Sequence, residues 1–209
     1  RARLNMQLSD AQRDALTELG NIGISRAARQ LSALLNEPIQ IEVPSVELCT
    51  AARAHRHFDP RGGDLACVYQ RMSGELDGRI ALLLPSRDSH LLFQKLLGAG
   101  VALQGLDLRA YEHEAMTEIG NILISSCVSA MADMLSIRID VSVPRYAEAA
   151  IQDLFQDVTE ANMERPALLI HTRLTAARRE LEGTILLLLS AAAAEKVMFA
   201  VQAMILAAD

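Results

Sequence analysis

The chain has 209 residues, of which 51% are hydrophobic and 3% aromatic, and a formal net charge of −6. This length allows a sizeable core, and the hydrophobic fraction argues against a disordered chain. The acidic balance argues against nucleic-acid binding, which usually needs a basic surface, and suits soluble protein partners. Three cysteines do not form the even set of a disulfide framework, and the first residues lack the apolar segment of a signal peptide, so we expect a cytoplasmic protein.

The first half of the chain predicts two helices and three strands. Ser9 and Gln12 form a capping box, so a long helix should begin there. Apolar and polar residues alternate after this helix, which predicts a strand that ends at Pro44. In chain order, we expect a helix to about Leu35, strands over 39–43, 65–72 and 80–84, and a helix over 89–97. Gly62 and Gly63 indicate a turn and not a phosphate-binding loop, because no Lys-Ser/Thr pair follows them.

The second half repeats this order of elements. We expect a helix over about 108–135, strands near 137–143, 167–174 and 184–189, and a helix over 191–206. The apolar stretch from Thr184 to Ala208 is long enough to cross a bilayer. Glu195 and Lys196 near its middle would be costly there, so we expect a strand and a buried helix, with no membrane span. A dimer contact is the open alternative for the last helix.

Four residues of metal-binding type lie near one another in the sequence: Cys49, His55, His57 and Cys67. Their spacing matches no standard zinc pattern. We therefore expect a solvated loop at His55–His57 and no metal site.

The chain contains an internal repeat. The segment LTELGNI at 16–22 recurs as MTEIGNI at 116–122, and Pro44 recurs as Pro144. A second match, ELDGRI at 75–80 and ELEGTI at 180–185, has a larger offset, so the second half carries a short insertion. We therefore expect a tandem duplication with halves of about 9–104 and 107–209.

Each half alone would leave open sheet edges, which proteins usually pair or cover. The simplest arrangement is one continuous, mainly antiparallel sheet across both halves, related by a pseudo-twofold axis. We therefore predict an α/β (α+β) fold with two long helices, and a single domain over 1–209 built from the two repeats.

Both long helices carry a polar stripe on the side away from their apolar residues, at about 100° per residue. The stripe residues are Asp14, Glu18, Asn21 and Ser25 in the first helix, and Glu114, Glu118, Asn121 and Ser125 in the second. Asn and Gly are both poor residues in a helix interior, yet a Gly-Asn pair occurs in the middle of both helices. A local rule that is broken twice in the same way indicates a functional constraint, although a relic of the duplication is the alternative. The missing side chains at Gly20 and Gly120 would also let another surface approach closely.

At these residues the chain resembles the CheC/CheX/FliY family of chemotaxis phosphatases. The family's pattern is Asp or Ser, three residues, Glu, two residues, Asn, twenty-two residues, Pro. Asp14, Glu18, Asn21 and Pro44 fit every position. The second copy fits at Glu118, Asn121 and Pro144 and departs at Glu114. Two copies in one chain are similar to the two-site, CheC-like members of the family.

The resemblance implies a substrate, the aspartyl-phosphate of a CheY-like receiver domain of two-component signalling, and a possible CheD partner. It also implies that Glu18 and Glu118 pair with a lysine of the receiver and that Mg²⁺ belongs to the receiver, so that this chain needs no cofactor of its own. From the residues themselves, an Asn carboxamide can hold a water without titrating, so Asn21 and Asn121 are the candidates to orient the attacking water. Asp14, Ser25, Glu114 and Ser125 are candidate partner-binding residues. The alternative function is a non-catalytic adaptor or flagellar switch component that binds a receiver or a CheD-like protein.

Overall fold

The computed structural model describes residues 8–57, 65–97, 108–148, 164–176 and 179–208. The helices are α1 (Asp10–Leu35), α2 (Ala51–His57), α3 (Ser86–Leu97), α4 (Leu108–Leu135) and α6 (Ala191–Ala208). The strands are β1 (Ile39–Thr50), β2 (Leu65–Gly74), β3 (Gly78–Pro85), β4 (Ile139–Val141), β5 (Arg145–Glu148), β6 (Pro166–Ala176) and β7 (Arg179–Leu189). The expected turn at Gly62 and Gly63 lies outside the described residues.

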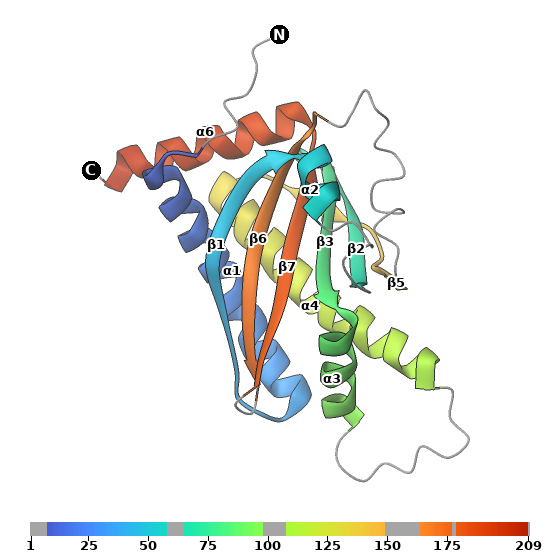
Figure 1. Cartoon of the computed structure of the whole chain (residues 1–209). Helices are drawn as coiled ribbons and strands as arrows, with labels where there is room; N and C mark the ends of the chain where they lie inside the picture. The colour runs from blue at the N-terminus through green and yellow to red at the C-terminus, as the bar shows by residue number, and fades with distance from the viewer. Residues whose placement is uncertain (1–7, 58–64, 98–107, 149–163, 177–178, 209) are drawn as a thin grey trace.

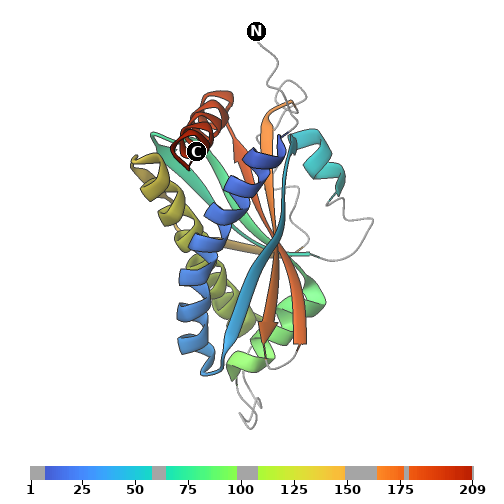
Figure 2. The ribbon, with the colours of Figure 1, turned by 90° about the vertical axis from the view of Figure 1, so that its left-hand side faces the viewer.

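The strands form a single antiparallel sheet with the order β1-β6-β7-β3-β2-β4, and β5 also pairs with β2. The long helices α1 and α4 pack against each other and cover one face of the sheet, while the short α2 lies on the opposite face (Figures 1 and 2). The predicted fold class, one mainly antiparallel sheet with two long helices, is confirmed.

The sheet order interleaves the two halves of the sequence. The first strand of the first half, β1, pairs with β6 of the second half, and β4 and β5 of the second half pair with β2 of the first. The strands β3 and β7 pair at the centre. Neither half therefore completes its own sheet. The division into repeats over 9–104 and 107–209 within one domain stays a prediction, since its junction lies outside the described residues.

The main core lies between the helices and the sheet. In α1 the buried positions are Leu16, Leu19, Gly20, Gly23, Ile24, Ala27 and Leu31, which recur every three or four residues along one side. The capping box predicted at the start of α1 is present: the Ser9 Oγ accepts from the Gln12 N–H at 3.2 Å, and the Ser9 N–H donates to Gln12 Oε1 at 3.0 Å. The buried apolar side of α1 determines which side of the helix faces outward.

The first strand does not end at Pro44 as predicted. β1 continues to Thr50, and the register of its pairing with β6 shifts between Glu42 and Ser45. Pro44 is tolerated because β1 is an edge strand and because this irregularity removes Pro44 from the ladder. In the second half the expected strand near 137–143 is instead two short strands, β4 and β5, separated by residues 142–144.

His55 belongs to a helix, α2, and not to the predicted solvated loop. Ala51 and Ala54 of this helix are fully buried against the sheet, and that packing was not visible in the local pattern. Among the described residues no group of three or more His, Cys, Asp or Glu side chains is arranged to hold a metal ion.

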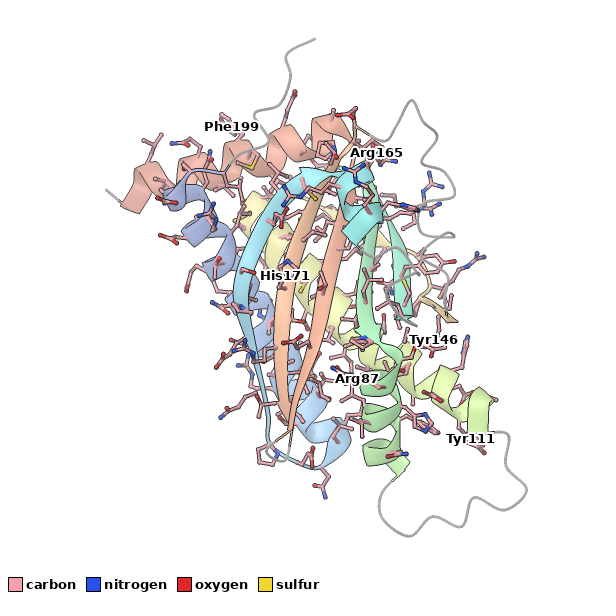
Figure 3. All side chains as sticks on the ribbon, viewed as in Figure 1. Arg87, Tyr111, Tyr146, Arg165, His171 and Phe199 are labelled. Carbon is pink, nitrogen blue, oxygen red and sulfur yellow. The ribbon has the colours of Figure 1, made fainter. Side chains whose placement is uncertain are left out.

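The apolar stretch from Thr184 onward is a strand followed by a helix, as predicted. However, α6 is buried on one side only, because Phe199 is 79% and Leu206 69% exposed, and Phe199 points away from the sheet (Figure 3). Within the described part of the chain, the segment Ala110–Leu135 is long and apolar enough to cross a membrane, but 56% of its apolar window is buried inside the fold. A core helix passes the same test, so this is weak evidence for a span.

Candidate functional site

The polar stripes predicted on the two long helices lie on the outer surface. The exposed members are Asp14, Glu18 and Ser25 in α1, and Glu114, Glu118 and Ser125 in α4. Asn21 and Asn121 are half-buried at the inner border of each stripe. The structure therefore brings each Glu and Asn pair onto one helix face, with the carboxylate in solvent and the carboxamide against the sheet.

The carboxamide of Asn21 is held by the backbone of the neighbouring edge strand. The Val43 N–H donates to Asn21 Oδ1 at 3.2 Å. Val43 lies where the β1 register shifts, so its N–H is free of the strand ladder and points to the helix. The next residue, Pro44, has no N–H to compete. This geometry gives a physical reason for the constant spacing between the Asn and the Pro.

The carboxamide of Asn121 is held by side chains. Gln70 of β2 donates from Nε2 to Asn121 Oδ1 at 3.0 Å, and the Ser125 hydroxyl donates to the same oxygen at 3.4 Å. Val143, the counterpart of Val43, is 82% exposed, whereas Val43 is 5% exposed. The two sites thus carry the same residues, but a backbone N–H holds the Asn21 carboxamide and side chains hold the Asn121 carboxamide.

The serines of the stripes differ as well. The Ser25 hydroxyl donates to the backbone oxygen of Asn21 at 2.7 Å, one turn earlier in the helix. Ser125 instead bonds to the Asn121 carboxamide. Hence Asn21 Oδ1 accepts one hydrogen bond within the described structure and Asn121 Oδ1 accepts two.

The sequence suggested that the glycines beside the asparagines let a partner surface approach closely, but these glycines do not open the site to a partner. Gly20 and Gly120 are buried and face the protein's own sheet. A Cβ on Gly20 would lie 3.2 Å from the Val43 side chain, and one on Gly120 would lie 2.5 Å from Val68. The surface that approaches closely is therefore the sheet, and the glycines let each Asn reach it.

The surroundings of the two stripes are held by contacts between helices and at the sheet edge. Arg26 of α1 forms an ion pair with Asp133 of α4 at 3.1 Å. The rings of His113 on α4 and Tyr146 on β5 meet edge to face with centroids 5.0 Å apart, and Figure 3 shows Tyr146 beside α4. These contacts tie both helices, and with them both stripes, to one framework.

The thiols of Cys49 and Cys127 are not poised for nucleophilic chemistry. Burial raises the pKa of the Cys127 thiol to about 12. Burial, together with the negative charge of Glu47, raises the pKa of Cys49 to about 11. A thiol must lose its proton to act as a nucleophile. Covalent catalysis by these two cysteines is therefore disfavoured near neutral pH.

Gln70 is the site residue that the sequence reasoning missed. The inward-facing residues of β2 are Ala66, Val68, Gln70 and Met72. A single polar residue among apolar neighbours at alternate positions is the signal that could have marked it. Its partner lies 51 positions away in the sequence, and only the packing of α4 on β2 brings the two together.

Comparison with known proteins gives the family and the fold of the chain. The model of the CheC-like family matches residues 12–48 and 114–146, which contain both Glu and Asn pairs. The solved structure of Thermotoga maritima FliY has a TM-score of 0.76 and 22% sequence identity, and the match covers 94% of this chain and 98% of that one. At this identity the likeness shows the fold.

Two relatives from Bacillus subtilis match the chain by sequence. The CheY-P phosphatase CheC is 30% identical over 138 residues, which are 66% of this chain and 66% of CheC. The flagellar motor switch phosphatase FliY is 26% identical over 138 residues, or 66% of this chain and 36% of that protein. The matched segment thus spans about two thirds of one relative and about a third of the other. Taken with the family match at both stripes, these similarities show that the chain belongs to the CheC-like family.

Proposed function

We propose that this chain is a chemotaxis phosphatase that hydrolyses the aspartyl-phosphate of a CheY-like response regulator. The observation that carries the proposal is the pair of exposed Glu residues, each one turn from an Asn whose carboxamide oxygen is held by a hydrogen bond. The name of the B. subtilis relative CheC, a CheY-P phosphatase, supports the same reaction class.

Hydrolysis of an aspartyl-phosphate requires mainly that the enzyme position the attacking water. An aspartyl-phosphate is an activated acyl phosphate, and its hydrolysis needs a water in line with phosphorus and stabilisation of the transition-state charge. The anchored carboxamides of Asn21 and Asn121 are suited to hold that water, because they keep one orientation before the receiver arrives. They do not titrate, so they keep this capacity across the neutral pH range.

Glu18 and Glu118 serve docking in this proposal. A carboxylate near a phosphoryl group would repel it unless a cation lies between them. The family resemblance assigns that cation to a lysine of the receiver, and pairing with it would align the helix with the receiver's pocket. In this proposal Mg²⁺ belongs to the receiver, and the chain needs no metal of its own. A CheD-like partner stays a prediction from the resemblance alone, as does a cytoplasmic location.

The decisive experiment is phosphate release from a phosphorylated CheY-like receiver with Mg²⁺, comparing the unmodified protein with Asn21→Ala/Asn121→Ala. Removing a group used mainly in the transition state costs about 10²–10³ in rate. We expect kcat to fall by about that factor while receiver binding, measured by titration with a non-hydrolysable phosphoryl mimic, stays near normal.

A matched control is Asn36→Gly, which changes an asparagine of left-handed conformation at the end of α1, remote from both stripes. It should leave turnover unchanged. Unchanged turnover in the double Asn variant would refute the mechanism. No turnover by the unmodified protein, combined with receiver binding, would instead support the adaptor function.

A further inference from the structure

Gln70 is an unusual residue for its surroundings. It lies on β2, is 1% exposed, and points into the apolar core between Val68 and Met72. Its Nε2 donates to Asn121 Oδ1 at 3.0 Å. Its Oε1 is buried and has no hydrogen-bond partner among the described residues. The NH₂ group of this amide therefore makes a hydrogen bond, whereas its oxygen is buried without one.

A buried amide with one unpaired atom is unfavourable for folding, because that atom loses its hydrogen bonds to water and gains none. An apolar residue of similar size would avoid this loss in a core of Leu, Ile, Val and Met. The local arrangement thus favours function over stability, which is the pattern expected at a functional site. The one bond that Gln70 does make is to the candidate catalytic carboxamide.

The first site shows why the second needs such a residue. Asn21 is anchored by the Val43 N–H, a backbone group that no substitution of Val43 other than proline removes. In the second half β4 ends at Val141, and Ser142 bonds to the backbone of Arg71 through its N–H and its hydroxyl. Val143 is turned to solvent. The Asn121 carboxamide then receives its bond from Gln70 instead.

We propose that Gln70 is a positioning residue of the second site, which holds the Asn121 carboxamide in its productive orientation; this rests on the proposed phosphatase function. Together with the Ser125 hydroxyl, Gln70 occupies both acceptor positions of Asn121 Oδ1. Asn121 therefore has its NH₂ group left to contact a partner. Asn21, with one acceptor position occupied, presents its NH₂ group and a remaining acceptor position.

The first test is kinetic and uses Gln70→Met, which keeps the shape of the side chain and removes the donor. It is made in two backgrounds, Asn21→Ala, where the second site works alone, and Asn121→Ala, where the first site works alone. Loss of orientation in a positioned group costs up to about 10²-fold in rate. We expect kcat of the second site to fall about 10- to 100-fold with KM unchanged, and kcat of the first site to stay the same.

Thermal unfolding of the same variants separates positioning from structural support. Because Met removes a buried unpaired oxygen, Gln70→Met should unfold at the same or a higher temperature. The control Thr184→Val, another buried polar-to-apolar change, lies on the sheet face opposite the long helices and should change neither site's kcat. A loss of kcat at both sites together with a lower Tm would overturn the proposal, as would an unchanged kcat at the second site.

The second test does not depend on turnover. In ¹H–¹⁵N spectra, Gln70→Met should shift the side-chain NH₂ signals of Asn121 and lower their order parameters, while those of Asn21 stay in place. Unchanged Asn121 signals would overturn the positioning role. If the unmodified protein has no phosphatase activity, the proposed function fails, and the spectra still decide whether Gln70 holds Asn121.

Discussion

The side chains of Glu18 and Glu118 stand apart from the asparagines next to them, because neither carboxylate bonds to another residue in the described part of the chain. An anchored carboxamide is prepared for one geometry, whereas a free carboxylate can adapt to an arriving cation. This difference fits a division of roles in which the Asn acts in the transition state and the Glu acts in docking.

Replacement of both glutamates by glutamine should therefore affect binding first. An ion pair worth about 1.4 kcal/mol corresponds to tenfold in affinity, so we expect KM for the phosphorylated receiver to rise roughly tenfold in Glu18→Gln/Glu118→Gln. The dependence of kcat/KM on salt should also weaken, because the variant lacks the two charges whose attraction to the receiver salt would screen. Steady-state kinetics between low and high salt measure both effects. Glu195→Gln, an exposed change on α6, is the control, and an equal KM change there would contradict a local role.

The buried thiols lead to a prediction about pH. The pKa of Cys127 is raised from 9.0 to about 12, and that of Cys49 to about 11, mainly by burial. Above pH 9 the unfolded chain loses these protons and the folded chain keeps them, so the free energy of unfolding should fall as pH rises from about 9 towards 11–12. Below pH 9 this contribution is fully present.

Denaturant unfolding at pH 8 and pH 10.5 measures this effect. The decrease between the two values should be smaller in Cys127→Ala than in the unmodified protein, because the substitution removes one of the groups responsible. Alkylation of Cys127 at pH 8 should also require unfolding. Rapid labelling of the native protein at this residue would show that the thiol is accessible and not buried as described.

The two long helices differ in how closely they approach the sheet at their mid-helix glycines. A Cβ on Gly120 would lie 2.5 Å from Cβ and Cγ1 of Val68, while a Cβ on Gly20 would lie 3.2 Å from the tip of the Val43 side chain. Alanine improves helix propensity by about 1 kcal/mol over glycine at both positions. At Gly120 the Val68 side chain must shift to admit the added Cβ, whereas at Gly20 the Val43 side chain must yield by only a few tenths of an ångström.

Gly120→Ala should therefore lower the free energy of unfolding by about 1–3 kcal/mol, the usual cost of overpacking a core. Gly20→Ala should change it by less than about 1 kcal/mol, since helix propensity and the mild contact oppose each other. Denaturant unfolding tests both. Val68→Ala combined with Gly120→Ala should recover part of the loss, and the absence of any coupling between the two changes would contradict the contact described.

At the scale of the whole molecule, the order of the strands makes the two halves depend on each other. β1 pairs with β6, and the central pairing of β3 with β7 also joins the halves. A chain limited to residues 1–104 would expose one side of β3 and leave β1 without a neighbour. Unpaired strand edges of this kind are unstable or associate with other chains.

We therefore expect residues 1–104 alone to be unfolded or to self-associate, and the full chain to unfold in one cooperative transition. Circular dichroism on heating and size-exclusion chromatography of both proteins measure this. A monomeric fragment with cooperative unfolding would show that each repeat is an independent domain, contrary to the single domain predicted.

The sequence alone determined the features that depend on local spacing. The helix α1 and the outward position of Glu18 follow from the period of the apolar residues, since a helix places every third or fourth side chain on one side. The capping box follows from Ser9 and Gln12, which are three residues apart. The repeat and the spacing from Asn21 to Pro44 also indicated the CheC-like family, because those patterns are contained in the chain itself.

The tertiary structure decided the features that depend on contacts between distant residues. Local alternation predicts a strand but not its partner, so the interleaved strand order and the passage of β1 through Pro44 were not predictable. The same holds for Asn21 and Asn121, whose sequence surroundings are nearly identical. A backbone N–H supports one and the side chain of Gln70 supports the other, because hydrogen bonds form between groups that packing brings within about 3 Å, whatever their separation in the sequence.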